Sequence, residues 1–126
     1  MQGNSGIWID HHDAFIVFAG ADDTTATGAE VDKHIKFSSH GSPHEGTAED
    51  HRERHLATER GKYYDEVIKQ VGDAGSILLF GPGEAKGELE KRFAAKGLGQ
   101  RIVGVETADK MTDHQIVAKT RQHYQK

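Results

Sequence analysis

The stretch Ile77-Leu78-Leu79-Phe80-Gly81-Pro82-Gly83-Glu84-Ala85-Lys86 decides the fold. Its first four residues are apolar on both sides of an extended chain, which is typical of a central parallel strand covered on both faces. Gly81-Pro82-Gly83 then turns the chain, and proline is favoured in the first turn of a helix. Apolar residues continue at helical spacing, at Ala85, Leu89 and Phe93. The stretch predicts a buried strand, a tight turn and a helix packed on the same sheet, with Gly97 ending that helix.

The residues before this stretch begin with a predicted hairpin. The runs 7–9 and 14–18 are rich in β-branched and aromatic residues, and the polar segment 10–13 connects them. A third strand is expected over Glu30–Phe37, where Val31, Ile35 and Phe37 share one face by period two. Trp8, Phe15 and Phe18 are interpreted as core residues of these strands. The chain therefore starts with three antiparallel strands.

A polar region follows, from Ser38 to about Arg60. Residues 38–50 have almost nothing to bury, so a mobile polar loop is expected there. Residues 48–60 are polar but rich in helix formers, which indicates an exposed helical extension. A better helix is expected after Gly61. Its buried stripe comprises Tyr64, Val67, Ile68 and Val71.

The end of the chain supplies one more strand and one more helix. Residues 102–105 are strand-like, and Thr112 with Gln115 forms a capping box before the last helix. The predicted order is βββαβαβα, in the α/β class. Such an order implies a mixed five-stranded sheet covered by helices, and ribonuclease-H-like folds share it.

Length and composition limit the classes of function. The 126 residues allow one domain, 1–126, with 35% hydrophobic and 29% charged residues. No apolar run is long enough for a bilayer, no signal peptide is recognisable, and there are no cysteines, so a cytoplasmic protein without membrane contact is expected. The net charge of -4 counts against a domain that binds nucleic acid mainly through phosphates, since such domains are usually basic overall, although it leaves room for a local basic patch.

The residues from about Arg52 to Phe93 carry a family resemblance. Tyr63-Tyr64-Asp65-Glu66-Val67-Ile68, the strand 77–80 and the turn 81–86 look like the middle domain of archaeo-eukaryotic release factors and pelota. In element order the resemblance extends over nearly the whole chain. It implies a translation-machinery fold and association with the ribosome.

The catalytic tripeptide of release factors has no counterpart here. In that family the loop before the first helix carries Gly-Gly-Gln, which promotes hydrolysis of peptidyl-tRNA. The corresponding residues are Pro43 to Ala48, in which only Gly46 matches and no glutamine occurs. The chain thus resembles the short bacterial relatives of this group. The resemblance implies a binding module more readily than an enzyme, with the ribosome, RNA or a protein as partner.

The candidate contact residues lie on the polar region and the glycine-proline turn. Arg52, Arg54 and Arg60 would touch RNA phosphates, although Glu49, Asp50, Glu53 and Glu59 alternate with them and favour a salt-bridged helix equally. The predicted binding set is Gly46, His51, Arg52, Arg54, His55, Arg60 and Lys86. Lys86 follows a strand-turn-helix that would suit a phosphate at a helix N-terminus. A purely structural turn is the favoured reading, since no Walker A ending follows, and no cofactor is predicted.

Two alternatives involve metal ions. Nine histidines are present, and His40 with His44, and His51 with His55, have the His-x-x-x-His spacing of a helical two-ligand site. No third rigid ligand accompanies them, so His51 and His55 remain the weak candidates of a His-rich metal-binding domain. Asp10, with Glu106, Asp109 and Asp113, would suit a metal-dependent ribonuclease-H-like hydrolase of nucleic acid. Turn and helix-cap roles explain most of these acids equally well.

Overall fold

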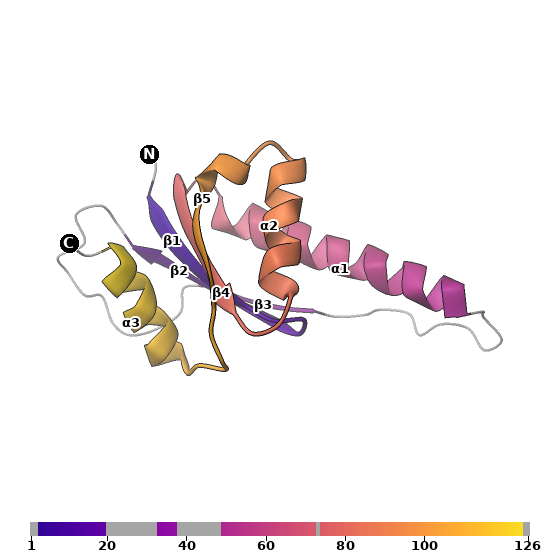
Figure 1. The fold of residues 1–126 in the computed structure, drawn as a ribbon, viewed down its shortest axis with the longest axis horizontal. Helices are drawn as coiled ribbons and strands as arrows, with labels where there is room; N and C mark the ends of the chain where they lie inside the picture. Colours follow the sequence, from indigo (N-terminus) through magenta and orange to yellow (C-terminus); the bar gives the residue numbers. More distant parts are fainter. Residues whose placement is uncertain (1–2, 20–32, 38–48, 73, 125–126) are drawn as a thin grey trace.

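The computed structural model describes residues 3–19, 33–37, 49–72 and 74–124, and for 49–57 it describes the backbone alone. Its strands are β1 (Asn4–Ile9), β2 (Asp13–Ala19), β3 (Lys33–Lys36), β4 (Ser76–Gly81) and β5 (Ile102–Thr107). Its helices are α1 (Glu49–Val71), α2 (Ala85–Ala95) and α3 (Asp113–Tyr124), with a short 3-10 turn, η1 (Gly99–Arg101). The predicted order βββαβαβα is confirmed (Figure 1).

One mixed sheet organises these elements, in the order β3-β2-β1-β4-β5. β1 pairs antiparallel with β2, and β2 pairs antiparallel with β3. β1 pairs parallel with β4, and β4 with β5. Ile7 of β1 lies opposite Leu79 of β4 at the centre, where both are fully buried. The predicted mixed five-stranded sheet is therefore confirmed, and β1 and β4 form its buried middle.

The sheet has helices on both faces (Figure 1). The face covered by α1 and α2 buries the larger cluster, which includes Ile7, Ile9, Tyr63, Tyr64, Val67, Ile77, Leu79, Leu89 and Phe93. The face covered by α3 buries a smaller one, made of Trp8, Val17, Leu78, Phe80, Ile116 and Val117. Because β4 contributes residues to both clusters, its apolar run needs no polar alternation.

The glycine-proline turn after β4 is shaped by contact with β1. Gly81 has a φ of 148°, and a Cβ at this position would lie 2.3 Å from the backbone oxygen of Ile9. Only glycine permits this approach. Gly83 also has a positive φ, of 65°, and α2 begins at Ala85, two residues after Gly83. The turn therefore positions the first turn of α2 beside the end of β1.

The helical extension predicted over 48–60 and the better helix expected after Gly61 form one element, in agreement with the single helix that the predicted order places between the third and fourth strands. α1 is a single helix of 23 residues that runs through Gly61 without a break. Glycine in a helix interior costs roughly 0.5–1 kcal/mol relative to alanine. Here Gly61 has a packing reason, because a Cβ would lie 3.2–3.4 Å from the guanidinium of Arg92 on α2.

Two predictions about the strands need smaller changes, and the predicted cap of the last helix is confirmed. β3 is described over 33–36, and residues 30–32 of the predicted strand lie outside the described residues. Trp8 is buried as expected, but Phe18 near the end of β2 is 40% exposed, although period two places it on the same strand face as the fully buried Ala14 and Ile16. The capping box of α3 is confirmed, since Thr112 N–H donates to Gln115 Oε1 and Gln115 N–H donates to Thr112 Oγ1.

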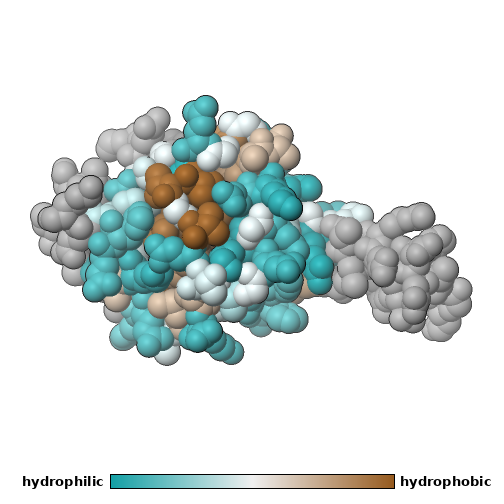
Figure 2. All heavy atoms as spheres, viewed as in Figure 1, coloured by the Kyte–Doolittle hydropathy of each residue, from teal (hydrophilic) through white to brown (hydrophobic). Residues whose placement is uncertain are grey.

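The two edges of the sheet differ in chemistry. β3 presents exposed Lys33 and Lys36, charged side chains that discourage strand addition. β5 instead exposes Val103 and Val105, at 49% and 37%, and an apolar patch interrupts the otherwise hydrophilic surface at this edge in Figure 2. None of the helices in the described part of the chain has the length and apolar character needed to span a bilayer.

Candidate functional site

The most prominent feature of the molecule is the length of α1. Its C-terminal half packs on the sheet beside α2, whereas its N-terminal half extends well beyond the sheet (Figure 1). The predicted contact residues His51, Arg52, Arg54 and His55 all lie in this extended half. Their helical backbone agrees with the sequence, while their side chains lie outside the described residues, as do Gly46, His40 and His44.

Two adjacent tyrosines anchor α1 where it meets the sheet. The Tyr63 hydroxyl donates a hydrogen bond of 2.9 Å to the backbone oxygen of Asp10, at the end of β1. The Tyr64 hydroxyl donates to the carboxylate of Glu88 on α2 at 2.5 Å. Burial is the main cause that raises the pKa of both phenols above their ordinary value, so both stay neutral donors at neutral pH.

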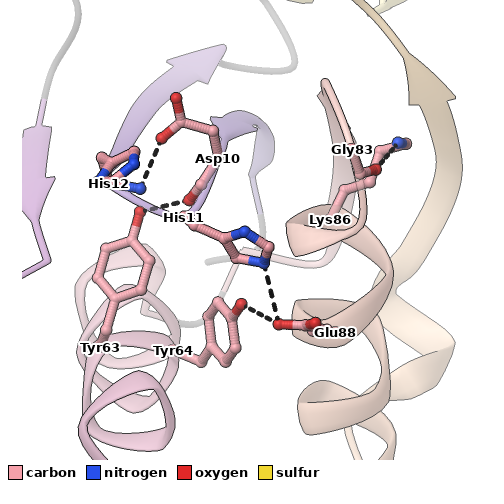
Figure 3. Close-up of polar contacts among 8 residues, drawn as sticks. All are labelled: Asp10, His11, His12, Tyr63, Tyr64, Gly83, Lys86 and Glu88. Atoms are coloured by element: carbon pink, nitrogen blue, oxygen red, sulfur yellow. Dashed lines mark hydrogen bonds and ion pairs between the residues drawn. The ribbon is translucent and has the colours of Figure 1, made fainter. Parts of the chain in front are cut away.

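Glu88 connects three elements (Figure 3). Its Oε1 accepts the Tyr64 hydrogen bond and lies 3.3 Å from Nε2 of His11, in the β1–β2 turn. That nitrogen is buried and makes no hydrogen bond within the described structure, although the ring as a whole is 35% exposed. A protonated His11 would form an ion pair with Glu88 here. The β1–β2 turn, α1 and α2 therefore meet at one carboxylate.

Asp10 has a structural role in the β1–β2 turn. Its Oδ1 accepts a hydrogen bond of 2.8 Å from the backbone N–H of His12 (Figure 3). It also accepts one of 2.7 Å from the backbone N–H of Asp13. The carboxylate thus closes the turn in the manner typical of aspartate. This geometry favours the turn interpretation over a metal ligand.

The other acids of the hydrolase alternative do not gather near Asp10. Glu106 lies on β5 and forms an ion pair of 2.6 Å with Lys119 of α3. Trp8, Phe80 and Glu106 are in register on β1, β4 and β5, so two strand spacings, roughly 10 Å, separate β1 from β5. Asp113 occupies the first turn of α3. Within the described part of the chain, no group of three or more potential ligands could hold a metal ion.

Lys86 bonds to its own turn. Its Nζ donates to the backbone oxygen of Gly83 at 2.5 Å (Figure 3). The amine therefore caps the turn that leads into α2, as the structural interpretation of 81–86 expects. This contact is exposed, so Lys86 still contributes positive charge to the surface near Lys91.

An ion-pair cluster fastens α2 to α1. Arg92 Nε and Nη2 each donate to one carboxylate oxygen of Asp65 at 2.8 Å, and Lys96 Nζ lies 3.4 Å from Asp65 Oδ1. The hydrogen bond from Arg92 is the first cause that lowers the pKa of the Asp65 carboxyl. This fixed guanidinium lies across Gly61, which explains the glycine.

A hollow of about 410 Å³ lies beside this cluster between α1 and α2. Seven residues line it: Arg60, Gly61, Tyr64, Glu88, Lys91, Arg92 and Ala95. We call it the α1–α2 groove. Of the binding residues that the sequence predicted, only Arg60 lines the groove. Lys91 and Arg92 were missed because they stand on α2, and no sequence spacing relates α2 to the polar region of α1.

No protein-family model and no curated protein match the sequence. Solved structures that resemble its fold include the following two. The Thermoplasma acidophilum Pelota protein superimposes with a TM-score of 0.62 at 15% identity, covering 96% of this chain and 32% of that chain. The archaeal translation termination factor aRF1 gives a TM-score of 0.58 at 16% identity, covering 98% of this chain and 34% of that one. The chain spans about a third of each protein, and the likeness confirms the fold class.

Proposed function

We propose that this chain is a binding module of the translation machinery, in the cytoplasm, and that it contacts the ribosome through the extended half of α1 and the polar segment before it. The observation that supports this proposal most directly is the shape shared with the archaeal translation termination factor aRF1 and with Pelota. The sequence adds the resemblance over 52–93 and the absence of Gly-Gly-Gln, which together favour binding over peptidyl-tRNA hydrolysis.

The form of α1 fits this role. A helix rises about 1.5 Å per residue, so the residues before Gly61 carry the tip of α1 well clear of the sheet. The extended half has too few apolar residues to require burial, and its sequence alternates arginine with glutamate. A slender polar helix of this kind can enter a narrow site on a large RNA-protein particle, while the sheet stays outside.

The experiment is co-sedimentation with purified ribosomes over a salt series. Wild-type protein should pellet with ribosomes at about 50 mM salt and be released towards about 200 mM, as counterion release requires. The variant R52E/R54E should lose association at the lowest salt. The matched control K36E/K110E changes the net charge equally at exposed positions on β3 and after β5, and should sediment like the wild type.

Two results would contradict the proposal. Absence of wild-type protein from the ribosomal pellet at low salt would remove the ribosome as partner. Equal losses in R52E/R54E and K36E/K110E would show that net charge alone governs association, and the extended half of α1 would then have no special role.

A further inference from the structure

We propose that the α1–α2 groove binds backbone phosphates of single-stranded RNA, with Arg60 and Lys91 as its phosphate ligands. The inference rests on the proposed function for its ligand and adds a second contact, at the base of α1. Its lining includes Arg60, Gly61 and Tyr64 of α1, the residues around the junction between the extended half of α1 and the half that packs on the sheet. An RNA strand lying along α1 would therefore reach it next.

The charges in the groove favour an anion. Three of its seven lining residues are cationic and one is acidic. Glu88, the acid, already accepts the Tyr64 hydrogen bond and faces His11. Arg92 is neutralised by Asp65. Arg60 and Lys91 form no ion pair with any described residue, so they supply the positive charge that the groove has not compensated internally.

The two cations come from different helices. Arg60 belongs to α1 and Lys91 to α2, and the positive charge of Arg60 lowers the pKa of the buried Tyr64 phenol against the larger effect of burial. Gly61, the nearly buried Tyr64 and Ala95 also line the groove. Because the phenol remains protonated, it adds no negative charge beneath the ligand.

The structure also explains why the groove keeps its shape without a ligand. Arg92 is held at two points by Asp65, and Lys96 reinforces the same carboxylate. A Cβ at position 61 would lie 3.2–3.4 Å from this guanidinium, so a side chain there would crowd it. The walls are thus fixed by contacts in which neither Arg60 nor Lys91 takes part, and both cations remain available. A phosphodiester fits this arrangement because guanidinium and ammonium groups are its usual partners.

The test measures binding of a fluorescent oligouridine by anisotropy across the same salt series. R60E/K91E should weaken binding about tenfold or more at low salt and should reduce the salt slope by about 1.4, the value for two phosphate contacts on a single strand. K36E/K110E, with the same change in net charge, should alter neither quantity by more than about twofold. Circular dichroism and thermal melts confirm folding, and R60Q/K91Q, which introduces no acid, should show an intermediate loss.

Each outcome decides between the proposals. Equal oligouridine binding by R60E/K91E and K36E/K110E would show that the groove does not bind the RNA phosphates. The inference would also fail if wild-type protein sedimented with ribosomes but did not bind oligouridine. Uridine monophosphate that competes as tightly as the oligomer would assign the groove to a free nucleotide instead of RNA. Groove-dependent RNA binding without ribosome sedimentation would preserve this inference and reject the ribosomal function.

Discussion

The two halves of α1 belong to one helix but differ in what they contact. The half after Gly61 buries Tyr63, Tyr64 and Val67 against the sheet and α2, and its sequence shows the apolar stripe that such burial requires. The half before Gly61 extends beyond the sheet, and its sequence has no such stripe. The difference shows that one helix can be at once a structural element and an exposed arm. Tertiary contacts stabilise the half after Gly61. The half before Gly61 depends on helix propensity and on its continuity with the packed half.

The largest expected difference between the halves is in stability. Ile68→Ala, in the anchored half, removes a side chain that is 8% exposed and should lower the free energy of unfolding by about 2–4 kcal/mol. Thr58→Ala, at an exposed position just before Gly61, should change it by less than about 0.5 kcal/mol. Urea denaturation followed by circular dichroism measures both. Similar losses in the two variants would mean that α1 is packed along its whole length.

The tyrosine anchor should give a smaller effect that depends on pH. Tyr63→Phe leaves the backbone oxygen of Asp10 without its partner and should cost about 1–2 kcal/mol at neutral pH. The folded state raises the pKa of this phenol above the ordinary 10.0, so its contribution is complete below pH 10.0 and is lost as the pH rises further. The variant should therefore lose less stability than the wild type above pH 10.0.

Tyr124 provides the matched comparison outside α1. Its hydroxyl donates to the backbone oxygen of Ser5, and burial raises its pKa to about 12. Stability that depends on Tyr124 should fall between pH 10 and pH 12. Phenolate absorbance, recorded together with circular dichroism, shows whether ionisation accompanies unfolding. Ionisation of all three tyrosines near pH 10 in a folded protein would contradict the burial of these hydroxyls.

The ion pair beside Gly61 should have the smallest effect. Asp65 and Arg92 are 38% and 42% exposed, so Asp65→Asn should cost no more than about 1 kcal/mol at neutral pH. The folded state lowers the pKa of Asp65 below its ordinary 3.8, so its contribution is present above that pH and disappears as the pH falls below it. The variant and the wild type should therefore converge in stability in acid. A constant difference from neutral pH into strong acid would assign the loss to packing instead of charge.

Features with a local sequence signal were predicted, and contacts between distant residues were not. The run 77–80 and the turn 81–83 predicted the central strand and the entry to α2 because each depends on local patterning. Asp10 and Lys86 were each given a structural alternative, and the observed contacts support it. The contact between His11 and Glu88 was not predicted, because the two residues are far apart in the sequence and no local signal links them. The α1–α2 groove was not predicted for the same reason.

Gly61 and Gly6 show where local rules fail. In the sequence, Gly61 separates the polar extension from the apolar stripe, and glycine disfavours a helix interior when only the local chain is considered. The approach of Arg92 gives it a reason to stand inside one helix. Gly6 lies in the middle of β1, where a Cβ would lie 2.1 Å from Thr120 Oγ1 of α3. No sequence pattern within β1 predicts this close approach of α3.

The order of the elements, the buried strand at the centre and the polar nature of the arm before Gly61 can all be predicted from the amino-acid sequence. These properties follow from periodicity and composition, which act over a few neighbouring residues. The meeting of three elements at Glu88, and the presence of Arg60 and Lys91 in one hollow, depend instead on tertiary packing. Contacts of that kind depend on how separate elements pack, because the sheet brings distant parts of the chain together at distances that sequence spacing does not encode.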